Sequence, residues 1–162
     1  MESTQLPIVE ARRQAIAQAT PAKKKSDFGQ FFTPWPIAEF MAGLFGSMAG
    51  RDVCLLDAGA GIGSLTASFA ARARADGAAS IDVEAWEIDP ALGGHLRETL
   101  DEMGAAGSPF CGRIQPWDFV VEASAEIVSG AEARFTHAIL NPPYKKMKSV
   151  SEQRRAVRVA GV

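Results

Sequence analysis

The spacing of apolar residues changes character near residue 53. Before this point, apolar side chains recur at three- and four-residue intervals over 6–19 and again after Pro36, which predicts two helices. From Val53 onward, short apolar runs alternate with stretches of helical periodicity. Such alternation is typical of an α/β domain with a parallel sheet and helices on both faces.

The predicted strands end in residues with unusual chemistry. We expect strands over 53–56, 81–86, 110–115 and 138–140, helices over 65–75 and 91–103, and a helix or long loop around 122–129. Ligands of open α/β sheets bind at the carboxyl ends of the strands, so we expect the segments that follow the four strands to converge on one crevice.

Composition and charge narrow the class of protein. The chain has 162 residues, 47% hydrophobic and 22% charged, as in a globular domain. A formal net charge of -2 argues against nucleic-acid binding through overall positive charge, so any DNA contact must be local. Cys54 and Cys111 lie in or beside apolar runs and lack zinc-ligand spacing, so we expect no disulfide and no metal site. Without a signal peptide or a run approaching the roughly 20 apolar residues of a membrane span, we expect a cytoplasmic protein with no membrane partner.

A glycine-rich loop from Asp57 to Gly63 follows the first predicted strand. Glycine lets a backbone turn sharply and approach a ligand closely. The glycines stand at every second position, unlike the dinucleotide fingerprint, and Asp57 would repel a pyrophosphate but suits an ammonium group. The loop therefore favours S-adenosylmethionine as cofactor. A tight turn in another Rossmann-like protein is the alternative reading.

The second strand is followed by an acidic pair, Glu87 and Asp89. Glu87 lies near the roughly 20-residue offset at which an acid meets ribose hydroxyls. A carboxylate can accept hydrogen bonds from both hydroxyls of a diol. We assign the ribose to Glu87, and we assign the cap of the next helix to Asp89, which precedes Pro90.

The sequence Asn-Pro-Pro-Tyr follows the fourth strand, at residues 141–144. Two prolines stiffen the loop and leave carbonyl acceptors without N–H donors. The Asn141 side-chain carbonyl and the Pro142 backbone carbonyl could accept both N–H bonds of an adenine amine and aim its lone pair at a methyl donor, with no strong base required. Tyr144 could stack on the base. A proline-stiffened turn is the alternative.

Basic residues follow this loop. Lys145, Lys146 and Lys148, and then Arg154, Arg155 and Arg158, place positive charge beside the proposed pocket. A base inside duplex DNA must be flipped out before it is methylated, and phosphate contacts help to hold such a duplex. A solvated basic tail is the alternative.

These segments, in their order, resemble the adenine-N6 DNA methyltransferases of restriction-modification systems, in particular the subgroup whose Thr-Pro motif precedes the glycine loop. The resemblance runs from about residue 23 onward. The segments that carry it are residues 28–34 (Phe-Gly-Gln-Phe-Phe-Thr-Pro), the glycine loop, residues 87–90, Asp118 with Phe119, and residues 141–144.

The resemblance implies a role for each matching residue. Thr33 and Pro34 would hold the methionine end of S-adenosylmethionine. Asp118 would meet its adenine amine, with Phe119 packing beside that ring. The rest of the cofactor site would comprise Asp57, Ala58, Gly59, Gly61, Glu87 and Ile88. Asn141, Pro142 and Tyr144 would receive the target adenine, and Lys145, Lys146 and Lys148 would contact double-stranded DNA. For Phe31 and Phe32 we expect core packing instead.

The family also implies more chain than is present. We expect a helical leader over 1–22, a cofactor-binding and catalytic core over 23–144, and a basic segment over 145–162 that begins a missing half. The sheet would be an incomplete Rossmann-like class I methyltransferase sheet of about four parallel strands with flanking helices. A complementing chain would supply the other strands and the target-recognition region, and we expect the isolated chain to bind cofactor weakly or not at all. Two alternatives stay open: a protein-glutamine methyltransferase, and a non-catalytic remnant or partner subunit.

Overall fold

A computed structural model describes residues 5–19, 32–106, 109–142 and 151–162. The helices are α1 (Gln5–Ala19), α3 (Trp35–Gly43), α4 (Ser64–Asp76), α5 (Pro90–Ala105), α6 (Phe119–Ser129) and α7 (Glu152–Ala160). The strands are β1 (Asp52–Ala58), β2 (Ser80–Trp86), β3 (Phe110–Gln115) and β4 (His137–Ala138).

The four strands form one parallel sheet in the order β3-β2-β1-β4. β1 and β2 pair along their whole length, so Asp57 stands opposite Ala85 and Ala58 opposite Trp86. Since every strand runs the same way, the segments that follow them emerge at one edge of the sheet. The predicted fold class, a Rossmann-like sheet of four parallel strands with flanking helices, is confirmed.

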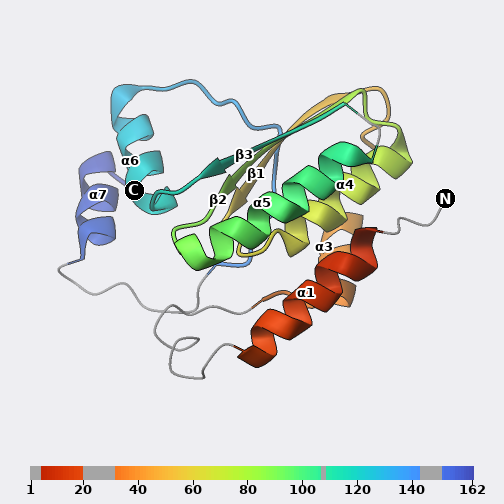
Figure 1. The fold of residues 1–162 in the computed structure, drawn as a ribbon. Helices are drawn as coiled ribbons and strands as arrows, with labels where there is room; N and C mark the ends of the chain where they lie inside the picture. The colour runs from red at the N-terminus through yellow and green to blue at the C-terminus, as the bar shows by residue number, and fades with distance from the viewer. Residues whose placement is uncertain (1–4, 20–31, 107–108, 143–150) are drawn as a thin grey trace.

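Helices α4 and α5 lie side by side over one face of the sheet, and α1 packs outside them (Figure 1). The core between sheet and helices contains Leu55, Val83, Phe69 and Leu96, all fully buried. Side chains alternate between the faces of a strand, and on the other face Cys54 and Leu56 are only half-buried. The α4–α5 face therefore carries the main core.

The predicted element boundaries differ from the structure mainly at the fourth strand. The predicted third strand, 110–115, coincides with β3. The fourth, predicted over 138–140, is limited to His137 and Ala138, which pair with Leu55 and Leu56. Ile139 still donates to the Leu56 carbonyl, but the chain then leaves the sheet towards Pro142, which has no N–H to continue the pairing.

Two helices are defined only in the structure. The region around 122–129 is the helix α6, which begins after its cap Asp118. The basic segment contains α7, whose exposed side chains include Arg154, Arg155 and Arg158. The half-buried side of α7 carries Gln153, Ala156, Val157 and Ala160, and α7 packs against α6. Spacing of three and four residues is what an amphipathic helix requires.

Candidate active site

The glycine loop turns back on the end of β2. Gly59 and Ala60 both donate their N–H to the Trp86 carbonyl, at 2.9 Å. Gly61 and Gly63 adopt positive φ angles of 59° and 85°, a region that side chains disfavour. A Cβ on Gly61 would also lie 3.6 Å from the Phe32 ring. The glycines therefore let the loop fold tightly over the strand ends, as the sequence predicted from their spacing.

Glu87 ties the loop to the second strand. Its Oε2 accepts from the Gly61 N–H at 2.8 Å, and its Oε1 accepts from the Asp89 N–H at 2.7 Å. Burial raises the pKa of Glu87, although the hydrogen bonds from Asp89 and Gly61 oppose the rise. A carboxylate has about four acceptor sites, so Glu87 can accept from a further donor beside these backbone groups. The loop and the acid that the sequence placed in one crevice are thus in direct contact.

Asp57 lies beneath the loop and is fully buried. Its Oδ2 accepts from the Thr66 hydroxyl at 2.7 Å, whereas its Oδ1 has no hydrogen-bond partner within the described part of the chain. Burial raises the pKa of Asp57 to about 7, against the lowering effect of the Thr66 hydrogen bond. A buried acceptor without a donor costs roughly 1–3 kcal/mol, so Oδ1 is a destabilising feature of the chain beneath the loop.

A small cleft brings the predicted cofactor and acceptor segments together. Its lining comprises Phe32, Thr33, Gly59, Ala60, Gly61, Ile62, Ser64, Leu65 and Asn141. Asn141 Nδ2 donates to the Thr33 hydroxyl at 3.1 Å across 108 positions of sequence. The Ser64 hydroxyl has no partner among the described residues. The cleft therefore joins the Thr-Pro segment, the glycine loop and the fourth-strand tip.

Other predicted site residues lie away from this lining. Asp118 caps α6, since its Oδ1 accepts from the N–H groups of Val120 and Val121 at 2.9 and 3.2 Å. Its Oδ2 accepts from the Gln153 amide at 2.8 Å. The Phe119 ring meets Trp86 edge-on, with centroids 5.4 Å apart. These residues form a second group, where β2 and β3 end.

The remaining predicted residues divide between exposed, buried and undescribed positions. Pro34, Ile88 and Pro142 are exposed, and Ala58 is buried. Several predicted residues lie outside the described part of the chain: residues 28–31, which include Phe28 and Phe31, and Tyr144, Lys145, Lys146 and Lys148. We expected Phe32 to pack in the core, and this was wrong, since its half-buried ring lines the cleft beside Gly61.

Sequence reasoning missed three polar partners of the site. Thr66 and Ser64 lie in the first turn of α4, directly after the glycine loop. This position in the sequence could have marked their hydroxyls as candidate site groups. Gln153 had no such signal, because only the docking of α7 on α6 brings it to Asp118.

Over residues 5–19, 32–106, 109–142 and 151–162, no three His, Cys, Asp or Glu side chains are grouped to hold a metal ion. No helix within those ranges has the length and apolar character to cross a bilayer.

Two known proteins match most of the chain. Type II methyltransferase M.BsuBI of Bacillus subtilis is 41% identical over 145 residues, which cover 86% of this chain and 29% of that protein. Type II methyltransferase M.PstI of Providencia stuartii is 34% identical over 171 aligned positions, which cover 99% of this chain and 33% of that protein. No protein-family model matches the chain. The chain spans about a third of the length of these relatives, and its predicted resemblance to the methyltransferases of restriction-modification systems is confirmed.

Proposed function

We propose that this chain carries the cofactor-binding and acceptor loops of a DNA methyltransferase that acts on the N6 amine of adenine. One observation carries the proposal: Asn141, Thr33 and the glycine loop line the same cleft. Methyl transfer needs the acceptor held in near-attack contact with the donor, about 3–3.5 Å away, so the two binding loops must face each other. The two relatives carry the name type II methyltransferase, which supports the same activity.

The residues around the cleft fit S-adenosylmethionine. The backbone of Gly59 and Gly61 can approach a ligand without side chains in the way. The Ser64 hydroxyl lines the cleft without a partner in the described chain and is available to a polar group of a ligand, and the Glu87 carboxylate can accept from a diol. When bound, this cofactor supplies an activated methyl group on a sulfonium. We assign Thr33 and Pro34 to its methionine end, and Ile88, Asp118 and Phe119 to its adenine.

We assign the binding of the target adenine amine to the fourth-strand tip, the segment that follows β4. The exocyclic amine of adenine is a poor nucleophile because its lone pair is delocalised into the ring. The Asn141 amide oxygen and the Pro142 carbonyl would accept its two N–H bonds and turn the lone pair towards the methyl donor. With Asn141 Nδ2 directed at the Thr33 hydroxyl, we assign Oδ1 as the acceptor for the target amine.

We assign the contacts to DNA to the segment that follows Pro142. Tyr144 would stack on the flipped base, and Lys145, Lys146 and Lys148 would contact phosphates. Arg154, Arg155 and Arg158, which are exposed on α7, would add further phosphate contacts.

A labelled-methyl assay tests the proposal. The chain, alone and mixed with a chain carrying the strands and recognition region of a relative, is incubated with S-adenosylmethionine and duplex DNA. We expect cofactor-dependent label in N6-methyladenine. Label in a glutamine-containing peptide but not in DNA would show that the Asn-Pro-Pro-Tyr loop serves methylation of a glutamine amide and not of adenine. Lack of cofactor binding in every combination would contradict the proposal and leave a non-catalytic remnant.

A further inference from the structure

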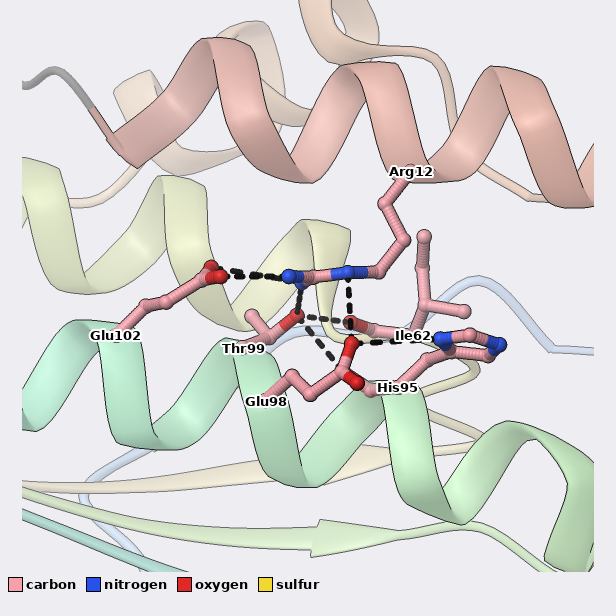
Figure 2. A network of polar contacts seen from close by, with 6 residues as sticks. All are labelled: Arg12, Ile62, His95, Glu98, Thr99 and Glu102. Carbon is pink, nitrogen blue, oxygen red and sulfur yellow. Dashed lines mark hydrogen bonds and ion pairs between the residues drawn. The ribbon is translucent and has the colours of Figure 1, made fainter.

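Helix α1 is linked to the glycine loop through the partly buried Arg12 and, on α5, the buried Thr99. Figure 2 shows Arg12 descending from α1 towards α5, where Thr99 turns to the Ile62 carbonyl of the loop. The Arg12 guanidinium donates from NH1 to the Thr99 hydroxyl at 2.9 Å, and that hydroxyl donates to the Ile62 oxygen at 2.8 Å. The relay joins three segments that lie far apart in the sequence.

The Thr99 hydroxyl is suited to this position because it both accepts and donates. It has one proton, and the Ile62 carbonyl at 2.8 Å lies closer than the His95 carbonyl at 3.1 Å. Thr99 and Ile62 are both essentially fully buried. A buried carbonyl deprived of its donor costs free energy, so this hydrogen bond holds the Ile62 peptide in one orientation.

Packing reinforces the hydrogen bond. A Cβ on Gly63 would lie 3.0 Å from both Leu96 Cδ1 and Thr99 Cγ2, which is too close for an ordinary contact. Helix α5 therefore presses directly on the loop at Gly63. The loop has no space to relax towards α5.

Arg12 in turn is fixed on α5 by two carboxylates. Its Nε lies 3.1 Å from Glu98 Oε2, and its NH2 lies 2.5 Å from Glu102 Oε1. The Arg12 side chain is only 14% exposed, so these ion pairs are partly shielded from water. The two acids flank Thr99 on one face of α5, and they aim the guanidinium at the hydroxyl.

We propose that Arg12 and Thr99 are positioning residues for the glycine loop, so that α1 belongs functionally to the cofactor site. The effect on cofactor affinity rests on the proposed function. The effect on the loop does not, since it concerns the chain without ligand. A leader helix with no role in the site would leave the loop unchanged when this relay is cut.

The first arm of the test measures amide hydrogen exchange in the chain without cofactor. Thr99→Val keeps the shape and removes the hydroxyl, whereas Thr99→Ser keeps the hydroxyl. We expect exchange at Gly61 and Gly63 to speed up roughly tenfold in Thr99→Val and to stay near the parent in Thr99→Ser, with Val83 of β2 unchanged in both. Uniform acceleration of all three amides, or none at all, would overturn the proposal.

The second arm titrates S-adenosylmethionine and S-adenosylhomocysteine against the parent, Arg12→Met and Arg72→Met. Arg72 is the matched control, because it too forms a helix ion pair, with Asp76, and donates to the carbonyls of Gly43 and Phe45. We expect Arg12→Met to weaken binding about tenfold at a temperature where all three are folded, and Arg72→Met to bind like the parent. Equal affinities would overturn the proposal. If the parent binds neither ligand, alone or mixed with the complementing chain, the proposed function fails, and the exchange data alone decide the positioning role.

Discussion

The glycine loop and the fourth-strand tip face the same cleft, but the described contacts hold them very differently. The loop is fixed by the Trp86 carbonyl, by the Glu87 carboxylate and, from behind, by Thr99. The tip follows a strand of two residues that pairs with β1 alone in the described sheet, and Asn141 reaches across to Thr33.

This contrast means that the fold holds the glycine loop, on the cofactor side, more firmly than the fourth-strand tip, on the acceptor side. A typical hydrogen bond contributes a net free energy of about 1 kcal/mol, so a loop with several buried ones is held in one conformation. A tip on an edge strand relies on fewer such contacts. Changes in the loop should therefore alter cofactor affinity and stability, whereas changes at the tip should alter the methyl-transfer rate.

The largest expected effect comes from Asn141→Ala. The substitution removes the side-chain acceptor for the target amine while leaving the glycine loop intact. We expect the methyl-transfer rate to fall by roughly 10²–10³-fold, as when one preorganised polar group is removed from an active site. Cofactor affinity, measured by titration, should change little.

Asn141→Asp is the matched control, because it keeps an acceptor but loses the donor to Thr33. It should retain more activity than Asn141→Ala. Strong loss of cofactor binding in Asn141→Ala, with an unchanged rate at saturation, would place Asn141 on the cofactor side of the comparison.

The second effect concerns the buried acid under the loop. Burial raises the pKa of Asp57 to about 7, above its ordinary value of 3.8. The folded state therefore holds this proton more tightly than the unfolded chain, and the stability it contributes is present below pH 4 and lost as pH rises through 7. Thermal unfolding across this range should show a steeper fall for the parent than for Asp57→Asn.

Glu87 is present in both proteins, so its own raised pKa cancels in that difference. Equal slopes for parent and variant would show that Asp57 ionises normally in the folded chain. A ligand that supplies a cation to Asp57 should flatten the parent slope as well.

The smallest effect is expected at α7. Gln153→Ala removes the donor to Asp118 Oδ2, while Asp118 keeps its two backbone donors in α6. We expect a loss of about 0.5–1.5 kcal/mol, confined to the docking of α7 and seen as faster amide exchange over 152–160. Arg155→Ala, an exposed change on the same helix, should leave that exchange unaltered. Unchanged exchange in Gln153→Ala would mean that the apolar contacts alone hold α7.

Much of the fold was readable in the sequence, because local periodicity encodes which residues form a helix or strand. Residues 110–115 were predicted as a strand, and the structure has a strand over the same residues. The fourth strand was placed too late, since an apolar run does not state where pairing stops. Phe32 was assigned to the core from its residue type alone, whereas the structure places its ring in the lining of the cleft.

The sequence by itself determined that an acid, a glycine loop and an Asn-Pro-Pro segment would meet, because parallel strands bring their carboxyl ends to one edge. Only the tertiary structure decided which groups satisfy the loop from behind. Arg12 and Thr99 are 87 positions apart, and nothing in the spacing of either residue points to the other. The partner of a buried polar group is chosen by which helices pack together, and that choice depends on the whole core.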